Sequence, residues 1–308
     1  MHFNQLDLNL LVALDALLTE RSITEAGRRT HVSQSAMSGS LARLREYFED
    51  ELLVQIGRKM VPTALGDTLA EPVREILLKI KATVDTKPGF DPASSTRRFS
   101  LMMSDYVSTV LMNEVVQHAE SLAPHVSFEI VSNDMVNPGD ALERGDIDLL
   151  IMPQDFLSKN HPEEVLFSDD YACIVWEGNS VVGESLSRED YLRLGHVSMQ
   201  FGRGRIPLID EWFLSRLGVN RRVEVLTMSF SSLPQYIVGT HRIGTTHRRM
   251  ARHYSRYLPL RVVPCPYEMP SLVEAMQWHK YFSSDPGITW LRGVLKKVAN
   301  GLEPHHSP

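Results

Sequence analysis

Apolar residues recur at helical spacing in two short runs between positions 23 and 48. In the second run, four apolar residues lie four, three and four positions apart and form one stripe: Met37, Leu41, Leu44 and Phe48. A turn at 31–33 separates the two runs, and Ser33 is a residue type that caps helix N-termini. The pattern therefore predicts two helices joined by a turn.

The face of the second helix opposite this stripe is small and polar. It carries Ser35, Gly39 and Ala42, flanked by Gln34, Ser38, Arg43 and Arg45. Such a face can approach a DNA major groove closely, and its side chains can hydrogen-bond to bases and phosphates. An ordinary helical hairpin at a protein surface has the same pattern, so this segment alone leaves both interpretations open.

Two short strand-like runs follow, Leu52–Ile56 and Met60–Val61, and the basic turn Gly57-Arg58-Lys59 joins them. A hairpin directly after a candidate recognition helix is the outline of a winged helix-turn-helix. In that geometry Arg58, at the wing tip, lies near a phosphate or the minor groove.

A long amphipathic run begins after Thr63, which is well placed to cap it. Six apolar residues form one stripe along it: Leu65, Leu69, Val73, Ile76, Ile80 and Val84. Nothing obvious in its own chain covers this stripe, so we expect it to pack against the same helix of a second copy. The turn-rich stretch 86–95 that follows is the best domain boundary in the chain.

The remainder alternates strand-like and helix-like runs, which predicts α/β layers with largely parallel sheets. Strands are expected at 99–103, 126–131, 148–152, 171–176, 196–200, 223–227, 242–245, 261–263 and 272–278. Helices are expected at 107–122, 139–144, 188–194, 209–217, 232–238 and 286–298.

Composition places the chain among soluble globular proteins. It has 308 residues, 43% of them hydrophobic and 23% charged. No stretch approaches the ~20 apolar residues that span a bilayer, and the N-terminus lacks the features of a secretory signal. The two cysteines, Cys173 and Cys265, cannot form a disulfide framework and are expected to be buried and reduced. We therefore expect a cytoplasmic protein without a membrane segment.

Charge gives only weak support to DNA binding. The net charge is −6, and residues 1–62 carry seven Lys/Arg against eight Asp/Glu. A basic surface would require the acidic segment 49–51 to be turned away from the arginines. Two copies in a dimer would double the phosphate contacts.

The ordered set of N-terminal motifs resembles the DNA-binding domain of LysR-type transcriptional regulators. The motifs are Leu8-xx-Leu11, the SQSAMS run at 33–38, Leu41-xx-Leu44-Arg45 and Pro62-Thr63-xx-Gly66. In the second half, LERGDIDLLI (142–151) resembles the family's helix-to-strand signature. FGRGRIP and a late MQWH segment resemble the NodD/NahR branch. One departure is Ser35, which stands where the family usually has proline, so the preferred DNA half-site can differ.

The resemblance implies an α/β protein with an N-terminal winged helix-turn-helix, a long linker helix, and a two-lobed co-inducer domain similar to periplasmic binding proteins. The expected domains are 1–62, a linker or dimerisation helix at 63–90, and a co-inducer domain at 91–308. Lobe I would span about 97–168 and 275–300, and lobe II about 169–274. The implied partners are double-stranded promoter DNA, RNA polymerase and further copies of the chain, as a homodimer or homotetramer.

Carried onto this chain, the resemblance assigns the DNA contacts. Gln34, Ser35 and Ser38 would face base edges, Ser33 and Arg43 would hold phosphates, and Arg58 would serve the wing. Glutamine can pair with adenine through two hydrogen bonds. The alternative is that Gln34 and Ser38 only solvate the helix start.

The ligand is expected in the cleft between the lobes, where a mostly apolar wall carries a few polar groups. Ser104 and Asp105 end the first strand and open a helix, where free N–H groups favour polar ligand atoms. Further candidates follow other strands or cross the hinge: Tyr106, Phe201, Arg203, Phe230, Ser231 and Trp278. This aromatic set would suit a phenolic, flavonoid or aromatic-acid inducer of an activator. The aromatic residues could equally be core.

No catalytic or metal-binding motif stands out. GRG at 202–204 lacks the spacing of a phosphate-binding loop, and His241, His247 and His253 lie six apart without an HExxH or CxxC motif. We expect no enzyme activity, no metal and no cofactor beyond the inducer. The rival interpretations are a regulator that answers a non-aromatic metabolite or an oxidant, and an enzyme with a fused DNA-binding head.

Overall fold

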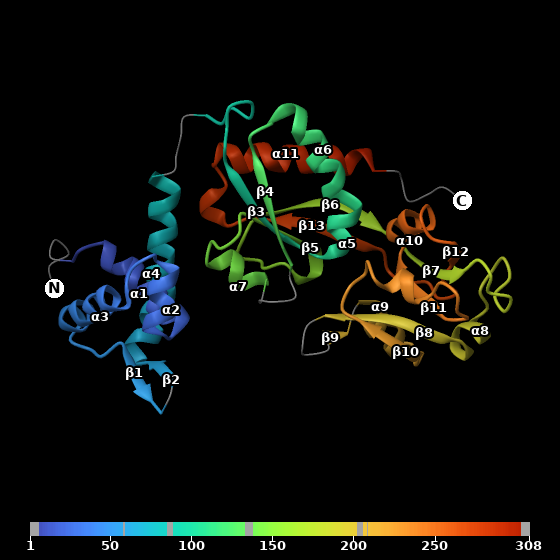
Figure 1. The fold of residues 1–308 in the computed structure, drawn as a ribbon, viewed down its shortest axis with the longest axis horizontal. Helices are drawn as coiled ribbons and strands as arrows, with labels where there is room; N and C mark the ends of the chain where they lie inside the picture. The colour runs from blue at the N-terminus through green and yellow to red at the C-terminus, as the bar shows by residue number, and fades with distance from the viewer. Residues whose placement is uncertain are drawn as a thin grey trace. The chain divides into compact units, whose positions relative to one another are not determined.

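The computed structural model describes residues 6–57, 59–84, 89–132, 138–201, 206–207 and 209–302, without the side chains of 201, 206 and 207. The chain divides into two compact units, Met1–Thr86 and Lys87–Pro308 (Figure 1). Each unit has its own hydrophobic core. Within the described ranges, no helix combines the length and the apolar character needed to cross a membrane.

The first unit is built from helices and one hairpin. Its elements are α1 (Asn9–Glu20), α2 (Ile23–Arg29), α3 (Gln34–Phe48), β1 (Leu53–Ile56), β2 (Lys59–Pro62) and α4 (Ala64–Val84). The hydroxyl of Ser22 caps α2 by accepting from the Glu25 N–H, and the hydroxyl of Ser33 caps α3 by accepting from the Ala36 N–H at 3.2 Å. The predicted helix-turn-helix is therefore confirmed.

The predicted apolar stripe of α3 is the face that packs into the core. Met37, Leu41 and Leu44 are at most 3% exposed and lie against Leu14 and Leu17 of α1 in one cluster. Full burial of side chains of this size stabilises the unit by about 1.5–3 kcal/mol each. This packing leaves the small, polar face of α3 in solvent.

The predicted hairpin is also confirmed, because β1 and β2 pair antiparallel. Arg45 of α3 donates to the carbonyl oxygens of Glu51 at 2.9 Å and Leu53 at 2.7 Å, which fixes the hairpin against the end of α3. Arg45 is therefore a structural brace, although sequence alone grouped it with the DNA-facing residues.

The stripe of α4 is only partly as expected. Its first half packs within the same chain, since Leu65 and Leu69 contact the core of the first unit and Val73 is buried there. The expectation that the whole stripe lacks a cover was wrong, because α1 lies against this half. The second half remains exposed, with Ile76 44% exposed and Val84 75% exposed.

The second unit contains two mixed sheets, each with its own strand set. The first has the order β4-β3-β5-β13-β6, from β3 (Arg98–Met103), β4 (Ser127–Ser132), β5 (Leu149–Pro153), β6 (Glu163–Asp169) and β13 (Leu272–Gln277). The second has the order β10-β8-β11-β7-β12, from β7 (Tyr171–Trp176), β8 (Gly195–Phe201), β10 (Arg222–Thr227), β11 (Ile243–His247) and β12 (Leu260–Pro264), with β9 (Ile206–Pro207) beside β8.

Parallel and antiparallel pairs are equally represented on the main path of each sheet, so the prediction of largely parallel sheets was wrong. In the first sheet β4, β3 and β5 pair in parallel, whereas β13 is antiparallel to both β5 and β6. In the second, β10, β8 and β11 are parallel, whereas β7 is antiparallel to β11 and β12. The antiparallel strands are those at the two chain crossings, from β6 to β7 and from β12 to β13.

Helices cover both sheets of the second unit. They are α5 (Asp105–Val107), a π-helical turn (Ser108–Met112), α6 (Asn113–Leu122), α7 (Pro138–Glu143), α8 (Arg188–Arg193), α9 (Ile209–Arg216), α10 (Arg248–Ser255) and α11 (Pro286–Gly301). Three-residue or four-residue 3-10 turns occur at η3 (Gln154–Phe156), η4 (Leu233–Tyr236) and η5 (Lys280–Phe282). In Figure 1, α6 and α11 lie side by side over the sheet that contains β3 and β4.

Most predicted elements are confirmed, and the exceptions have physical causes. The expected helix at 232–238 is only the 3-10 turn η4. The edge strand β6 was missed because it begins with two glutamates. The helix α10 was missed because its eight residues, RRMARHYS, bury only Met250 and Ala251.

Gly66 tests how closely the hairpin packs on α4. A Cβ at Gly66 would lie 2.4 Å from the carbonyl oxygen of Leu52, whereas a Cβ at Gly39 on α3 would meet nothing within 4 Å. We expect Gly66→Ala to lower the free energy of unfolding of the first unit by at least about 1–3 kcal/mol, because the added methyl group would overlap the backbone. Gly39→Ala should leave it unchanged or raise it by up to about 1 kcal/mol, since alanine favours helix. Urea unfolding followed by circular dichroism compares the two, and equal destabilisation would contradict the packing described.

Candidate functional site

The first candidate site is the exposed start of α3. The turn before it is tight, because a Cβ on Gly27 would already lie 3.0 Å from the Val32 carbonyl oxygen, and His31 adopts a positive φ of 57°. The Ser33 hydroxyl lies 3.0 Å from that of Ser35. Together with the Ser33 cap, these contacts hold the first turn of α3 in a defined orientation with its polar side chains in solvent.

The structure brings most of the predicted DNA-facing residues to this one surface. Ser33, Gln34, Ser35, Ser38 and Arg43 are all exposed. Arg58, the predicted wing contact, lies outside the described residues. The hydroxyl of Ser35 is thus held by Ser33 beside Gln34, where proline would have no hydrogen-bonding group.

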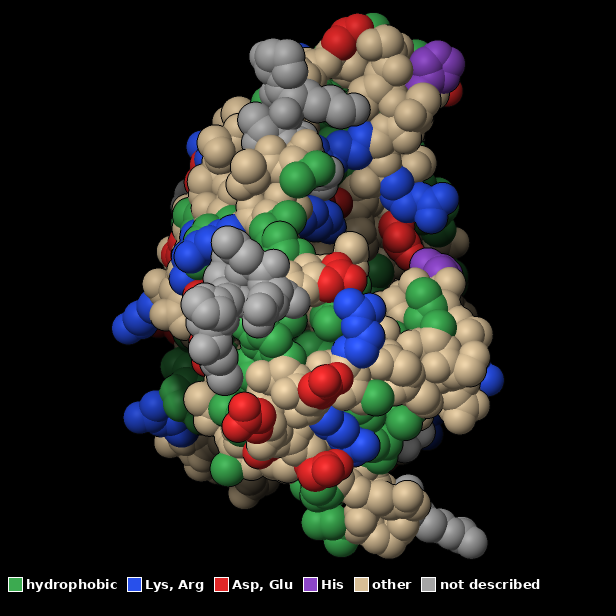
Figure 2. Space-filling model, turned by 90° about the vertical axis from the view of Figure 1, so that its left-hand side faces the viewer, with side chains coloured by type: hydrophobic (Ala, Val, Ile, Leu, Met, Phe, Trp, Pro, Cys, Tyr) green, Lys and Arg blue, Asp and Glu red, His purple; other side chains and the backbone are tan. Residues whose placement is uncertain are grey.

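Several arginines of the first unit are paired with carboxylates. Arg43 lies 3.3 Å from Asp7, Arg28 lies 2.6 Å from Glu25, and Arg29 pairs with Asp15 and Glu20. On the face shown in Figure 2, basic and acidic side chains are interspersed. The expected segregation of charge is therefore weak, and a phosphate must compete with Asp7 for Arg43.

The second candidate site is a cavity of about 230 Å³ between the two sheets of the second unit. Its walls combine residues of both sheets. The first sheet and its connections supply Ser104, Tyr106, Pro138, Ile151, Met152, Pro153, Phe156, Leu272 and Glu274. The second sheet and its connections supply Tyr171, Ile209, Asp210, Phe230, Thr245, Thr246 and His247. Most of this wall is apolar or aromatic, which is typical of a small-molecule site.

Three buried polar atoms in the cavity wall have no hydrogen-bond partner among the described residues. They are Oε2 of Glu274, Oγ1 of Thr246 and Nδ1 of His247. An unpaired polar atom in a protein interior costs about 1–3 kcal/mol. A ligand with matching polar groups would recover this free energy, so these atoms mark the polar end of the cavity.

Burial keeps two of these groups uncharged. It raises the pKa of Glu274 to about 8, with a smaller contribution from the negative charge of Asp169. It also lowers the pKa of His247 to about 3. At neutral pH the Glu274 carboxyl is therefore mostly protonated and can donate a hydrogen bond, while His247 is a neutral imidazole.

An aromatic cluster surrounds the His247 ring. The ring centroids of Tyr106, Tyr171 and Phe230 lie 4.3, 4.9 and 5.3 Å from that of His247. Tyr106 is fixed by donating its hydroxyl to Asp169 at 2.6 Å. The cavity wall is therefore rigid and aromatic on this side, which suits a planar ligand.

The chain crossings beside the cavity are tied by hydrogen bonds. Asp169 accepts from the Tyr106 hydroxyl, which belongs to the first sheet's side, and from the Arg249 N–H at 3.1 Å, at the start of α10. Asp105 accepts from the Ser229 hydroxyl at 2.7 Å and from the Ser231 N–H at 2.8 Å. Both carboxylates join one side of the cavity to the other.

The structure separates the predicted ligand residues into three groups. Ser104, Tyr106 and Phe230 line the cavity, whereas Asp105 and Ser231 bind each other and are not part of the lining. Trp278 is not in the wall, because its indole N–H donates to Ser283 and the Arg292 guanidinium stacks on its ring at 3.6 Å. The side chain of Phe201 and all of Arg203 lie outside the described residues.

Sequence reasoning missed Glu274, Thr246, His247 and Tyr171 as cavity residues. One signal was available for Glu274, which is the only charged residue in the apolar strand LVEAMQ. A carboxylate inside such a run is rarely buried without a role. The other three required the tertiary structure, because Thr246 and His247 end β11 and meet Tyr171 only through the pairing of β11 with β7.

Comparisons with known proteins agree with this arrangement. A family model described as bacterial regulatory helix-turn-helix protein, lysR family, matches residues 8–67, and one described as LysR substrate binding domain matches residues 92–300. The chain is 41% identical over 302 residues to Nodulation protein D 1 of Bradyrhizobium diazoefficiens, covering 98% of this chain and 96% of that protein.

Solved structures share the fold. A probable transcriptional regulator from Pseudomonas aeruginosa is similar with a TM-score of 0.64 and 26% identity, over 96% of this chain and 98% of that one. Full-length CbnR, solved in complex with its target DNA, is similar with a TM-score of 0.52 and 14% identity, over 96% and 100% of the two chains. At 14% identity, the similarity to CbnR shows a shared fold and nothing further.

The neutral state of Glu274 predicts a pH dependence of stability. Because its pKa is about 8 when folded and its ordinary value is 4.5, the folded chain binds more protons than the unfolded chain between these pH values. The contribution of Glu274 to the free energy of unfolding should therefore fall as pH rises from 5 to 8. The buried histidines, such as His247, contribute in the opposite direction below about pH 6.5, so the prediction concerns the difference between the wild type and a variant at Glu274. The side chain in Glu274→Gln is always neutral. The free energy of unfolding of this variant should therefore rise relative to that of the wild type by on the order of a few kcal/mol between pH 5 and 8.

Urea unfolding at pH 5, 6, 7 and 8 measures this difference. Glu114→Gln, at an exposed position on α6, is the matched control and should follow the wild type at every pH. A constant difference between Glu274→Gln and the wild type would show that Glu274 is charged when folded.

Proposed function

We propose that this chain, which belongs to the LysR family of bacterial helix-turn-helix regulators, controls transcription in response to a small aromatic compound bound in the cavity of its second unit. Family membership rests on the two domain matches, which together cover most of the chain, and on the full-length relative. The chain is accordingly a DNA-binding transcriptional regulator with a small-molecule-binding domain, and not an enzyme. The aromatic nature of the signal is the part that we propose.

One observation carries the choice of ligand: the cavity joins an aromatic wall to three polar atoms that have no hydrogen-bond partner in the described part of the chain. An aromatic ring would pack beside His247 and Phe230, and a hydroxyl or carbonyl on that ring would reach Glu274 or Thr246. Because Glu274 is mostly protonated and His247 is neutral, the site favours an uncharged polar substituent. We therefore place phenols and flavonoid-like compounds ahead of aromatic acids.

The ligand would act through the two sides of the cavity. Since both sheets supply its wall, a bound compound stabilises the arrangement in which the two sides are closest. The bridges from Asp169 and Asp105 lie beside the cavity and connect the same two sides. A ligand shifts the balance between the closer and the more open arrangement of the two sides only if it binds one of them more tightly. The hydrogen bonds made by Asp169 and Asp105 connect the two sides, so they would carry the change.

We assign the DNA contacts to the exposed start of α3. Gln34, Ser35 and Ser38 would face base edges, while Ser33 and Arg43 would hold phosphates. Arg58 is retained as the wing contact on the sequence pattern. Each paired base contact contributes about 1–3 kcal/mol of discrimination.

We propose that the regulator works as a homodimer or homotetramer in the cytoplasm and activates transcription through RNA polymerase. The exposed second half of α4, with Ile76 and Ile80, supplies an apolar face of the kind that pairs with a second copy. Two heads would also double the number of phosphate contacts.

A redox signal is the alternative that one observation favours. The thiols of Cys173 and Cys265 share a hydrogen bond, which raises the pKa of Cys173 and lowers that of Cys265. This proximity, which the sequence did not show, would allow an oxidant to join the two sulfur atoms. Promoter binding that changes with peroxide in the wild type, and not in Cys265→Ser, would favour it over an aromatic inducer.

A thermal-shift screen of phenols, flavonoids and aromatic acids tests the aromatic proposal. We expect a hydroxylated compound to raise the melting temperature of the wild type. Thr246→Val keeps the shape of the side chain and removes its unpaired hydroxyl, so it should weaken binding of a hit about 5- to 10-fold if that hit's hydroxyl reaches Thr246.

The control for this measurement is on the ligand side. The analogue that lacks the hydroxyl should bind the wild type and Thr246→Val equally, because it cannot use the missing group. Hits confined to non-aromatic metabolites would overturn the aromatic assignment. A hit recovered as a reaction product would overturn the regulatory one.

Gln34→Ala tests the assigned base contact. We expect it to reduce discrimination between the promoter and random DNA about 5- to 150-fold, because a paired adenine contact is lost. Glu46→Ala, at an exposed position further along α3, is the control for helix disturbance. Fluorescence anisotropy with both DNAs at one salt concentration measures the ratio, and an unchanged ratio would remove Gln34 from the contact set.

A further inference from the structure

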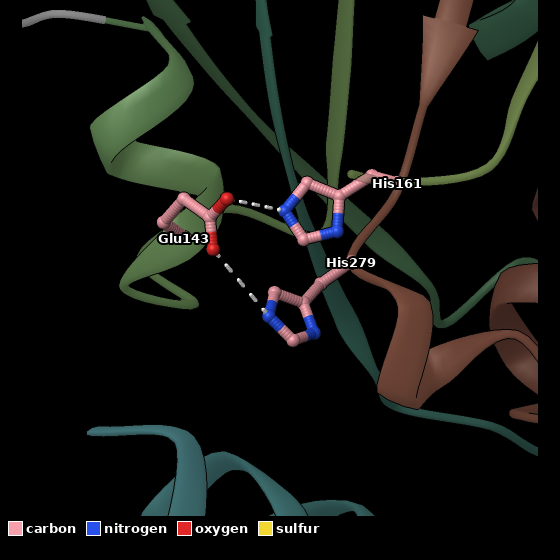
Figure 3. Close-up of side chains that lie close together, drawn as sticks. All are labelled: Glu143, His161 and His279. Carbon is pink, nitrogen blue, oxygen red and sulfur yellow. Dashed lines mark ion pairs between the residues drawn. The ribbon is translucent and has the colours of Figure 1, made fainter. Parts of the chain in front are cut away.

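Two histidines and one glutamate converge in the second unit, away from the residues that line the cavity. Glu143 is the last residue of α7, His161 lies just before β6, and His279 lies just after β13. One ligand atom from each falls within 4.8 Å of the others. Figure 3 shows the carboxylate facing both imidazole rings. Sequence spacing gave no sign of this cluster, because its members lie 18 and 118 positions apart.

The distances are close to those around a tetrahedral ion. Oε1 of Glu143 lies 2.9 Å from Nε2 of His161, and Oε2 lies 4.0 Å from Nε2 of His279. A tetrahedral Zn²⁺ at ~2.1 Å from each ligand atom holds those atoms ~3.4 Å apart. The two observed distances lie on either side of this value, and all three ligand atoms lie within 4.8 Å of one another.

The contact between Glu143 and His161 is not a hydrogen bond despite its length. Nε2 of His161 is fully buried and has no aligned hydrogen-bond partner in the described part of the chain. The side chain of Glu143 is 44% exposed, whereas those of His161 and His279 are 1% and 2% exposed. The arrangement thus has two buried nitrogen ligands and one carboxylate on the solvent side, from which an ion can enter.

Surrounding contacts hold the two rings in place. Gln277, at the end of β13, donates to the carbonyl oxygens of Ser158 at 2.6 Å and His161 at 3.4 Å. This ties the loop that carries His161 to the strand that precedes His279. The two imidazole rings pack with their centroids 4.6 Å apart. Prior ordering of this kind reduces the cost of assembling a site.

We propose that Glu143, His161 and His279 form a binding site for a divalent ion of the zinc type, with water as the fourth ligand. Two imidazoles and a carboxylate are a ligand set that Zn²⁺ accepts in open sites. Imidazole also selects such ions over Mg²⁺ and Ca²⁺, which prefer oxygen ligands alone.

The protonation of the rings sets the strength of this site. Nδ1 of His161 accepts from the Lys280 N–H, and Nδ1 of His279 accepts from the Tyr281 N–H, both at 3.3 Å. Each neutral ring therefore carries its proton on Nε2. Coordination through Nε2 moves that proton to Nδ1 and displaces the backbone N–H. Binding must offset these two long hydrogen bonds, so we expect it to be reversible and weaker than that of a structural zinc site.

The ion would also join elements that reach the cavity. The first residue of α7, Pro138, and Glu274 of β13 both line it, while Glu143 ends α7 and His279 follows β13 by two residues. The metal site itself does not depend on which compound occupies the cavity.

Isothermal titration with Zn²⁺ tests the site in the full-length chain. The C-terminal segment contains the adjacent pair His305-His306, which could bind metal independently, so both are changed to alanine in every protein tested. We expect one Zn²⁺ per chain in this background and no heat from Mg²⁺. Glu143→Gln and His161→Gln should each weaken binding about tenfold or more.

His253→Gln is the matched control, because it removes a histidine of α10 that is not in the cluster. Circular dichroism verifies that each variant is folded. Glu143 is half-exposed, so Glu143→Gln keeps the test valid even if His161→Gln does not fold. Absence of Zn²⁺ binding in the histidine-free-tail background would overturn the proposal. Binding that survives both Glu143→Gln and His279→Gln unchanged would overturn it equally.

Discussion

The second unit depends on one buried carboxylate at the crossing between its two sheets. Asp169 is fully buried and is the last residue of β6, and its oxygens accept from the Tyr106 hydroxyl and from the N–H at the start of α10. A buried charge without partners is costly, so these groups must remain in reach of it. The same carboxylate positions Tyr106 in the cavity wall and, through its charge, helps keep Glu274 protonated. The charge of Asp169 therefore links the chain crossing, the Tyr106 side of the cavity wall and the protonation of Glu274.

Binding specificity in the cavity follows from desolvation. Glu274, Thr246 and His247 each contribute a buried polar atom without a partner in the described structure, and burial holds two of the groups neutral. Such a site binds a ligand more tightly if the ligand's uncharged groups hydrogen-bond to these atoms, and more weakly if the atoms stay without a partner. The aromatic rings around His247 add shape selection without adding charge. The site is thus built to distinguish compounds by the position of their polar substituents.

The DNA-binding unit follows a different principle. Several of its described arginines are paired with carboxylates of the same unit, as Arg43 is with Asp7, and its acidic and basic residues nearly balance, so its attraction to DNA does not rest on a large positive field. Phosphate binding must replace these exposed pairs, which are weak in water and weaken further with salt. Selectivity is then left to the short side chains at the start of α3 and to the number of copies that bind together. Ser35, held by Ser33, gives this surface a hydroxyl where proline would have none.

Sequence by itself determined the local elements: the caps at Ser33 and Thr63, the stripe of Met37, Leu41 and Leu44, the hairpin, and most strands of the second unit. These depend on periodicity and on side chains near one another in the chain, which a single sequence contains. It placed Ser104, Tyr106 and Phe230 at the cavity because they follow strands. It misplaced Trp278, whose partner Arg292 is on another element, and it could not find Glu274 with Thr246, or Glu143 with His161 and His279. Only the tertiary structure decided these groupings, because the free energy of a buried polar group depends on neighbours that chain folding brings from distant positions.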